Sequence, residues 1–326
     1  MLSYWNNYPT IQKKLQTVCL QIEEQLTVRN KEIQNTLIEF SQAGGKYLRP
    51  ALFLLFAELA PHSKKDEKQL IQIAASIELL HMATLIHDDI IDDSPVRRGN
   101  ISVQAHYGKD IAVYTGDLLF TEFFDLIIKA MNGSKFLEIN AQAMKRLLLG
   151  ELDQMHTRYK KNETIEDYLQ SINGKTAELF WLACVEGAHF GGTDHATEKL
   201  AGQIGHDIGI AFQVNDDILD YTADSNQLNK PILEDLSQGV YTLPLLFAKQ
   251  EAPEAFRPYL EKKETISYED AKQVAELVII YQGVEKAKQF ALEYTKRALS
   301  TIEQLPDSQG KQTIYQLTKE MLHRTY

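Results

Sequence analysis

The sequence predicts an all-α fold, a single-domain helical bundle that spans residues 1–326. Three observations support this prediction. No proline occurs between residues 96 and 230, which permits long uninterrupted helices. Apolar residues in that span recur at three- and four-residue spacing, as at Leu119, Phe123 and Leu126. Alternating strand patterns with hairpin signals are missing from the sequence.

The helices are expected in a simple order along the chain. An apolar helix should run from near Leu79 to the aspartates at 88–93, and another should include Leu118 to Leu126. A third, containing Ile204, Ile208 and Ala211, should lead to the aspartates at 216–220. Turns are expected at Gly133-Ser134, Asn173-Gly174 and Gly191-Gly192.

The composition is that of an ordinary globular protein, with 44% apolar and 24% charged residues. Two scattered cysteines exclude a disulfide framework and favour a reducing compartment. The N-terminus lacks a signal-peptide pattern, and no stretch reaches the roughly 20 apolar residues of a membrane span. We therefore expect a cytoplasmic protein without a transmembrane segment.

The formal net charge of −11 argues against binding to nucleic acid or to a broad anionic membrane surface. Both of those partners favour basic patches. An acidic protein that binds a polyanionic substrate needs local cations, which are either Lys and Arg side chains or metal ions.

The first acidic cluster, Asp88-Asp89-x-x-Asp92-Asp93, ends the apolar run that begins near Leu79. On a helix, Asp88 and Asp92 share one face and lie one turn, ~5.4 Å, apart. Like charges repel at that spacing, and the helix dipole disfavours anions at a helix C-terminus. Mg²⁺ would remove the conflict, because it binds one or two carboxylates together with water and phosphate oxygens. A solvated acidic helix end is the alternative for this cluster alone.

The second acidic cluster, Asp216-Asp217-x-x-Asp220, follows the same pattern after an apolar helix. Two such helix ends in one all-α chain predict two carboxylate walls that face each other across a pocket. Such walls could hold two or three Mg²⁺ ions against a diphosphate. The sequence therefore predicts a magnesium-dependent site for a diphosphate-bearing substrate.

Basic residues near both clusters could supply the local cations. Arg97 and Arg98 follow the first cluster, where their planar guanidinium groups could bind phosphate or merely balance charge. Upstream, the glycines at 44–45 let the backbone approach a ligand closely and precede Lys46 and Arg49. The remaining candidates are Lys175 and Thr176, at an expected helix start, and Lys230, after the second cluster.

Taken in order, these motifs resemble those of the trans-isoprenyl diphosphate synthases (polyprenyl synthetases), over roughly residues 44–244. The resemblance is to medium- and long-chain members such as the catalytic subunit of heptaprenyl diphosphate synthase. The matching motifs are Gly-Gly-Lys-x-Leu-Arg-Pro at 44–50, His81, the Asp88–Asp92 box, Arg97-Arg98-Gly99, Lys175-Thr176 and Phe212-Gln213-x-x-Asp216-Asp217-x-x-Asp220.

The family resemblance implies an all-α bundle of the isoprenoid synthase type around a deep central cavity. It implies head-to-tail condensation of isopentenyl diphosphate with an allylic diphosphate by Mg-assisted ionisation, condensation and proton elimination. It also implies a homodimer, or a heteromer with a small non-homologous subunit. Because both aspartate boxes are intact, we expect this chain to be the catalytic subunit.

Residue roles follow from the same resemblance. Two or three Mg²⁺ ions would be bound by Asp88, Asp92 and Asp216, and that shell would be supported by Asp89, Asp217 and Asp220. The allylic diphosphate would be bound with the help of Arg97, Lys175 and Lys230. Isopentenyl diphosphate would be held by Lys46, Arg49, His81 and Arg98. The cavity near the developing carbocation would be lined by Thr176 and Gln213.

The loop after the second box departs from the family pattern. Asn229 and Leu233 replace glycines, and Val240 replaces a lysine expected near the diphosphate. These departures put the contribution of the lid loop in doubt, but not the metal site.

Product length in this family depends on side chains just upstream of the first box. Synthases of C15 products tend to carry an aromatic residue there, whereas this chain has the small Ala83 and Thr84, with Leu80 as the next obstruction. One helical turn is about as long as one isoprene unit, roughly 5 Å. We expect a C30–C40 all-trans product for a quinone side chain, with a C15–C20 product as the alternative.

Two other enzyme classes share part of this pattern. His87-Asp88 resembles the His-Asp pair of helical metal-dependent phosphohydrolases, which need further histidine ligands. Class I terpene cyclases share the aspartate-rich chemistry, but their second metal motif usually contains Asn and Ser or Thr. Neither class explains the second aspartate box of this chain.

Overall fold

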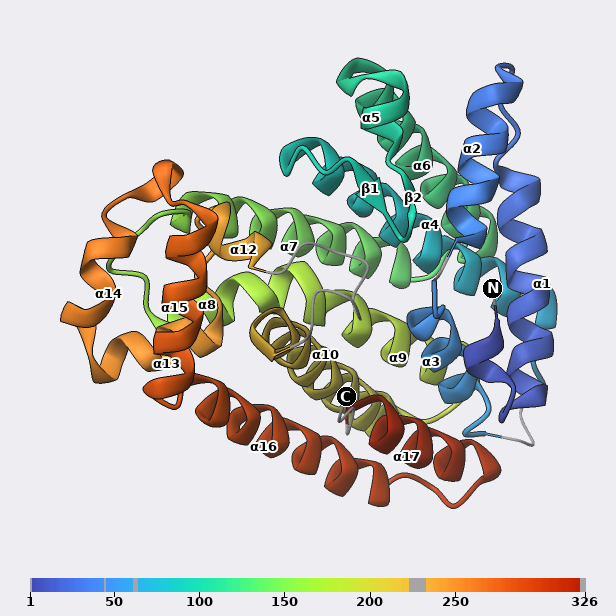
Figure 1. The fold of residues 1–326 in the computed structure, drawn as a ribbon. Coiled ribbons are helices and arrows are strands. Elements are labelled where there is room, and N and C mark those ends of the chain that lie inside the picture. The colour runs from blue at the N-terminus through green and yellow to red at the C-terminus, as the bar shows by residue number, and fades with distance from the viewer. Residues whose placement is uncertain (1, 44, 61–63, 223–232, 323–326) are drawn as a thin grey trace. The chain divides into compact units, whose positions relative to one another are not determined.

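The computed structural model of the chain describes residues 2–43, 45–60, 64–222 and 233–322. The regular structure of these residues is helical apart from two short strands, so the all-α prediction is confirmed (Figure 1). The N-terminal elements are η1 (Ser3–Trp5), α1 (Pro9–Gln25), α2 (Lys31–Gln42), α3 (Leu48–Ala57), α4 (Glu67–Ile91), β1 (Val96–Arg97), β2 (Asn100–Ile101), α5 (Val103–Tyr107) and α6 (Lys109–Ala130).

The second half of the described chain is helical throughout its regular elements. In chain order these are α7 (Phe136–Thr157), α8 (Ile165–Ile172), the π-helical turn η2 (Asn173–Ala177), α9 (Glu178–Phe190), α10 (His195–Thr222), α12 (Glu234–Ser237), α13 (Leu243–Glu251), α14 (Pro253–Leu260), η3 (Lys263–Thr265), α15 (Tyr268–Ile280), α16 (Gly283–Glu303) and α17 (Gln309–Leu322).

Contacts divide the chain into two compact units. Unit 1 contains Met1–Asn140, Ala183–Ala201 and Pro306–Gln312, and unit 2 contains Ala141–Leu182, Gly202–Leu305 and Thr313–Tyr326. The helices α7, α9, α10 and α17 contribute residues to both units. The prediction of one domain over residues 1–326 stays a prediction.

In unit 1, the helices α1, α3 and α6 pack against α4 (Figure 1). Asp66 is the N-cap of α4, and its side chain accepts a hydrogen bond from the amide of Gln69 at 3.1 Å. Leu79, Met82 and Ile86 of this helix are fully buried. Apolar side chains on all sides of a helix are typical of a core position.

By length and composition, α4 is also the one helix among the described residues that could cross a membrane. The most apolar 18 residues of this helix are 72% buried inside the protein, as is typical of a core helix in a globular fold. The absence of a transmembrane segment therefore stays a prediction.

A small hairpin after α4 was not predicted. Val96 pairs with Ile101 and Arg97 with Asn100 in two antiparallel strands. Arg98 and Gly99 form the loop with φ angles of 52° and 82°, as a two-residue turn with two left-handed positions requires. The hairpin therefore fixes Arg97 and Arg98 next to the end of α4.

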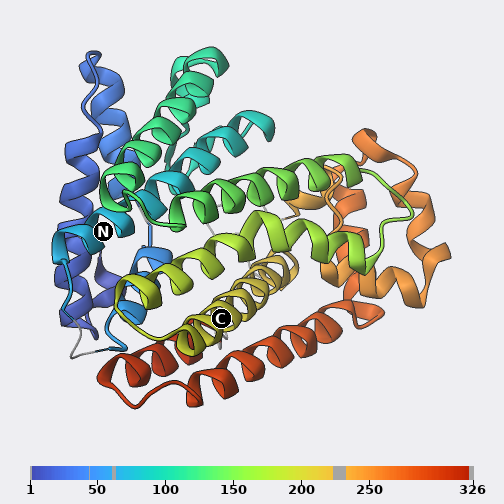
Figure 2. The same cartoon turned by 180° about the vertical axis from the view of Figure 1, so that it is seen from behind.

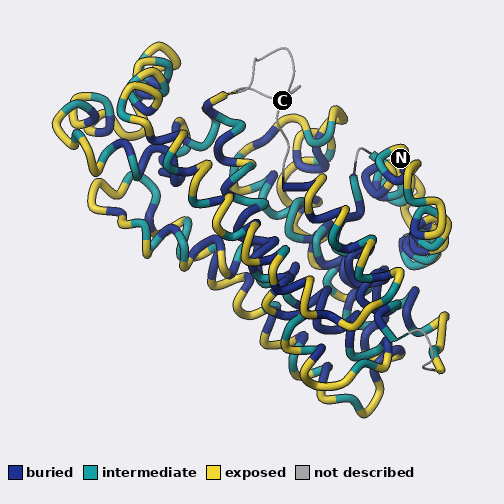
Figure 3. The backbone as a smooth tube through the Cα atoms, turned by 90° about the horizontal axis from the view of Figure 1, so that it is seen from below, coloured by how far each residue is buried: buried dark blue, intermediate teal, exposed yellow. Residues whose placement is uncertain are grey.

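In unit 2, one hydrophobic core joins residues of α8, η2, α10, α12, α13, α14, α15 and α16. Helix α13 packs on α16 (Figure 2). Capping boxes begin two of its helices, with Thr164 and Asp167 at α8 and Ser267 and Asp270 at α15. Buried and exposed residues alternate along the helices, as amphipathic sequences require (Figure 3).

Two of the three predicted turns are confirmed. Gly133-Ser134 connects α6 to α7, and Gly191-Gly192 connects α9 to α10. The prediction of a turn at Asn173-Gly174 is wrong, because the chain continues there as η2, a single π-helical turn between α8 and α9. The amide of Glu178 donates to the carbonyl oxygen of Asn173, which is the five-residue spacing of a π-helix.

Candidate active site

The first aspartate box lies at the C-terminal end of α4. The amide of Asp92 donates to the carbonyl oxygen of Asp88 at 2.8 Å, so the two residues lie one helical turn apart, as their spacing predicts. Both residues are half-buried. Their oxygen donors suit Mg²⁺, which binds one or two carboxylates and completes its shell with water and substrate phosphate. Within the described part of the chain, no three metal-ligating side chains converge on one point.

The second aspartate of this box is turned inward. The side chain of Asp89 is 1% exposed. Its Oδ1 accepts a hydrogen bond from Nε of Arg97 at 2.6 Å and forms an ion pair with Nη2 of the same guanidinium at 2.5 Å. Burial raises the pKa of Asp89, and the bonded guanidinium opposes that rise. The pair fixes the head group of Arg97 beside Asp88 and Asp92.

A basic cluster lies in the same unit. The guanidinium of Arg98 lies against Gly45, where an added Cβ would come within 2.8 Å of Nη1 and would displace the arginine head group from its present position. Burial, followed by the charges of Arg49 and Arg98, holds the pKa of His81 well below its ordinary value. Three residues predicted to hold isopentenyl diphosphate therefore lie close together.

The fourth predicted member of that group, Lys46, precedes α3. Its carbonyl oxygen accepts a hydrogen bond from the indole of Trp5 at 2.6 Å, and its ammonium lies 5.5 Å from the ring centre of Tyr4. The neighbouring Gly44 lies outside the described residues.

Glu78 is a charged residue of this cluster that the sequence analysis missed. It is 3% exposed. Burial raises its pKa, whereas the neighbouring charges of Arg98 and Arg49 lower it. A buried carboxylate next to two arginines compensates their charge and limits their movement. The signal in the sequence was a single acidic residue in the mostly apolar stretch from Leu70 to Ile86.

The second aspartate box lies near the end of α10, in unit 2. Asp216 is exposed, Asp217 is buried and Asp220 is half-buried. Oδ1 of Asp220 accepts a hydrogen bond from the amide of Leu233 at 2.9 Å. As in the first box, the first aspartate faces solvent more than the second.

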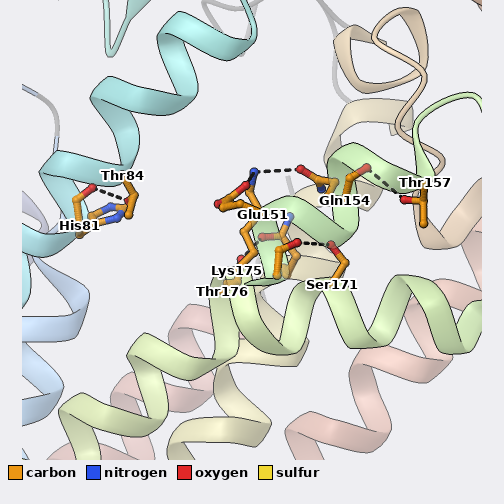
Figure 4. A network of polar contacts seen from close by, with 10 residues as sticks. His81, Thr84, Glu151, Gln154, Thr157, Ser171, Lys175 and Thr176 are labelled. Carbon is orange, nitrogen blue, oxygen red and sulfur yellow. Dashed lines mark hydrogen bonds and ion pairs between the residues drawn. The ribbon is translucent and has the colours of Figure 1, made fainter. Parts of the chain in front are cut away.

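The π-helical turn η2 carries Lys175, whose ammonium is held by α7. Nζ of Lys175 lies 2.8 Å from Oε2 of Glu151 and 3.0 Å from Oε1 of Gln154 (Figure 4). These two partners were not predicted. Single π-helical turns often occur at functional sites, which agrees with the predicted role of Lys175.

Two glycines bring η2 against α7. A Cβ on Gly150 would lie 2.4 Å from the backbone nitrogen of Lys175, and one on Gly174 would lie 2.5 Å from the carbonyl oxygen of Arg146. Both distances are too short for any side chain. The position of Lys175 relative to α7 therefore depends on the absence of a side chain at residues 150 and 174.

A chain of hydrogen bonds connects η2 to the second box. The hydroxyl of Thr176 donates to Oε1 of Gln213 at 2.6 Å, and Nε2 of Gln213 donates to Oδ1 of Asp217 at 2.9 Å. The hydroxyl of Tyr168 donates to Oδ2 of the same carboxylate at 2.5 Å. Burial raises the pKa of Asp217 well above its ordinary value. Thr176 and Gln213 thus contact each other, and Tyr168 is a further member that was not predicted.

A family model described as polyprenyl synthetase matches residues 30–279 of this chain. The chain belongs to the polyprenyl synthetase family. It is an enzyme of the trans-polyprenyl diphosphate synthase class, so the predicted family, fold class and prenyltransferase chemistry are confirmed. The phosphohydrolase and terpene cyclase alternatives are not retained. His87 instead packs on α6, with Nε2 3.2 Å from Oδ1 of Asp117.

Curated and solved relatives agree with this family assignment. The all-trans-nonaprenyl-diphosphate synthase (geranyl-diphosphate specific) of Rhodobacter capsulatus is 36% identical over 87% of this chain and 86% of its own length. Heptaprenyl diphosphate synthase component 2 of Bacillus subtilis is 30% identical over 87% and 80%. The crystal structure of geranylgeranyl pyrophosphate synthase from Lactobacillus brevis has a TM-score of 0.94 and 42% identity, and the match covers 99% of both chains.

The predicted chain-length residues of this polyprenyl synthetase lie on α4. Leu80 and Ala83 are buried, with 1% and 0% exposed. Thr84 is half-buried, and its hydroxyl donates to the carbonyl oxygen of His81 at 2.8 Å (Figure 4). Of the three, Thr84 therefore has the most accessible surface.

Two of the departures from the polyprenyl synthetase loop pattern fall within the described residues. Leu233, at a usual glycine position, has a left-handed φ of 63° and is 4% exposed. Val240 is half-buried, and its amide donates to the carbonyl oxygen of Asp235 at 2.8 Å. Asn229 and the predicted catalytic residue Lys230 lie outside the described residues.

Proposed function

We propose that this chain condenses isopentenyl diphosphate head-to-tail with an allylic diphosphate to give an all-trans polyprenyl diphosphate of C30–C40. The supporting observation is that unit 1 contains two different kinds of diphosphate-binding group. Asp88 and Asp92 suit a diphosphate bound through Mg²⁺, and the cluster of Arg49, Arg98 and His81 suits one bound directly. Two such modes fit a reaction with two diphosphate substrates.

Members of the family use divalent metal ions to bind diphosphate. For this chain we propose two or three Mg²⁺ ions, with Asp88, Asp92 and Asp216 as ligands. The exposed or half-buried position of these three carboxylates supports the assignment. Bound Mg²⁺ would neutralise the leaving diphosphate and so lower the barrier to carbon–oxygen cleavage.

The residues of the chain would perform the remaining steps. Lys175, oriented by Glu151 and Gln154, would donate hydrogen bonds to the allylic diphosphate as negative charge develops on it. Arg97 and Lys230 would act in the same way. Isopentenyl diphosphate, held by Lys46, Arg49, His81 and Arg98, would present its double bond to the allylic cation. The released diphosphate would then accept the proton that is lost.

The product length rests on Ala83 and Thr84, which are too small to block a growing chain. The heptaprenyl name of one relative supports a product in this range, and the nonaprenyl name of another denotes a product one isoprene unit longer than C40. A C20 product is the second candidate, because the 42% identical Lactobacillus brevis protein is named a geranylgeranyl pyrophosphate synthase.

We further propose a cytoplasmic enzyme that works as a homodimer, or as the catalytic subunit of a heteromer with a small non-homologous partner. The relative named component 2 supports the second arrangement. The net charge of −11 supports the absence of nucleic acid from its partners.

One incubation tests the proposed reaction. Purified protein is mixed with labelled isopentenyl diphosphate, farnesyl diphosphate and Mg²⁺, and the products are separated by chain length. We expect C30–C40 products that disappear with EDTA or in the Asp88→Ala variant. Turnover that survives either change would contradict the mechanism, and a C20 product would favour the second candidate.

A further inference from the structure

Each oxygen of the Asp217 carboxylate accepts a hydrogen bond from another side chain of the protein. Oδ2 accepts from the hydroxyl of Tyr168 at 2.5 Å, and Oδ1 accepts from Nε2 of Gln213 at 2.9 Å. Asp217 is 3% exposed and Tyr168 is 5% exposed. Two of the roughly four acceptor sites of this carboxylate are therefore used inside the protein, and its burial keeps the others away from a hydrated metal ion.

The two boxes hold their second aspartates in different ways. Asp89 of the first box is bonded to a guanidinium, that of Arg97. Asp217 of the second box is bonded by two uncharged donors, a phenol and an amide. The pair of Asp89 and Arg97 brings two opposite charges together, whereas the donors to Asp217 supply hydrogen bonds without a compensating positive charge.

Tyr168 occupies a position from which it reaches two functional segments. It lies in the middle of α8, which runs directly into η2 with Lys175 and Thr176. Its hydroxyl contacts the box on α10, 49 residues later in the sequence. Thr176 contacts the same box through Gln213, so α8, η2 and α10 are joined by one series of hydrogen bonds.

We propose that Tyr168 is a positioning residue that holds the second aspartate box in its metal-binding arrangement by anchoring Asp217. Asp217 then fixes the helix turn that carries Asp216, and does not itself bind Mg²⁺. The hydrogen bond matters because Asp216 is exposed and has no comparable support of its own among the hydrogen bonds seen for the described residues. This inference rests on the proposed function, since it assigns Asp216 to the diphosphate-bound Mg²⁺.

The test compares Tyr168→Phe with wild type in two measurements. The first is calorimetric titration with inorganic diphosphate in the presence and absence of Mg²⁺. The second is steady-state kinetics of the prenyl transfer. We expect the Mg²⁺-dependent part of diphosphate affinity to fall about tenfold, with a similar rise in the Mg²⁺ concentration needed for half-maximal rate. KM for isopentenyl diphosphate should not change, because its predicted ligands lie on other elements.

Two further variants separate positioning from general damage. Tyr281→Phe removes the hydroxyl of a half-buried tyrosine in the same unit and should leave both measurements unchanged. In an Asp217→Asn background, Tyr168→Phe should have little additional effect, because the two residues act as one unit. A loss of thermal stability with unchanged Mg²⁺ dependence, or fully additive effects in the double variant, would overturn the proposal.

The outcomes distinguish this inference from the proposed function. If wild type binds Mg²⁺ and diphosphate but forms no prenyl product, the proposed reaction fails and the titrations still decide the role of Tyr168. If wild type forms product and Tyr168→Phe behaves like wild type in both measurements, only the inference fails. If wild type shows no Mg²⁺-dependent diphosphate binding, both are overturned.

Discussion

Near the end of α4, Arg97 donates a hydrogen bond from Nε to Oδ1 of Asp89 at 2.6 Å, and its Nη2 forms an ion pair with the same oxygen at 2.5 Å. The carboxylate side chain is 1% exposed and the guanidinium side chain 18%. Loss of one partner would leave the other charge buried without compensation. The pair thus connects the stability of this region to the geometry of the first aspartate box.

Asp89→Asn should lower the free energy of unfolding by about 3 kcal/mol, the lower end for a broken buried ion pair, because part of Arg97 reaches solvent. Urea denaturation measures the change. The control is Asp125→Asn on α6, whose pair with Lys129 is exposed and should cost less than about 1 kcal/mol. Equal losses of unfolding free energy in the two variants would show that the buried pair of Asp89 and Arg97 stabilises the protein no more than an exposed pair does.

Gly150→Ala should disturb the position of Lys175. Its Cβ would lie 2.4 Å from a backbone atom, so α7 and η2 must move apart. We expect a loss of about 1–3 kcal/mol in stability, together with a higher KM for the allylic diphosphate. The control Gly310→Ala meets its nearest atom at 3.2 Å and should cost much less. If Gly150→Ala is destabilised but its KM is unchanged, the close approach of α7 to η2 does not contribute to substrate binding.

Glu186 should make stability depend on pH. This carboxyl is 0% exposed and accepts a hydrogen bond from Asn140, and burial raises its pKa from 4.5 to about 8. The folded state therefore keeps a proton that the unfolded state releases, so this contribution is full below about pH 4.5 and is lost as the pH rises to about 8. The slope approaches about 1.4 kcal/mol per pH unit in that window.

The Glu186→Gln variant isolates this contribution, because glutamine has a similar shape and no titrating proton. Unfolding free energies of both proteins are measured by urea denaturation from pH 5 to pH 8. The difference between variant and wild type should grow steadily in favour of the variant as the pH rises. A constant difference would mean that Glu186 does not titrate in this range.

Local sequence patterns predicted the helices and the aspartate spacing, because periodicity and i,i+4 neighbours belong to one helix. The patterns could not show which aspartate of each box turns inward. That depends on Arg97, 8 residues from Asp89, and on Tyr168, 49 residues from Asp217. Only tertiary structure brings such partners together.

The π-helical turn at η2 shows the same limit. Asn173 and Gly174 are turn formers by composition, which explains the wrong prediction. Their environment decides otherwise: Gly174 lies against the backbone of Arg146, and the side chain of Asn173 lies 2.7 Å from Nε2 of His206. Residues from two other helices thus hold the segment in a continuous helical path.

Leu233→Gly restores the residue that the family usually has, yet it should lower stability. Relief of the left-handed φ of 63° would gain about 1 kcal/mol, but the lost burial of a leucine that is 4% exposed would cost about 2–5 kcal/mol. Packing therefore outweighs strain. Gln282→Gly is the control, because that residue is left-handed and exposed, and it should be neutral or slightly stabilising.

Thr84→Phe should shorten the product, because a bulky ring at this half-buried position of α4 would block the path that a growing chain is proposed to take. Ala83→Phe should shorten it as well, but with a loss of about 1–3 kcal/mol in stability, since Ala83 is fully buried and a larger side chain overpacks the core. Product separation after incubation with labelled isopentenyl diphosphate measures chain length, and urea denaturation measures stability. Ile128→Phe, at an exposed position on α6, is the control and should change neither. If both α4 variants make the wild-type product, residues other than Ala83 and Thr84 limit the product length.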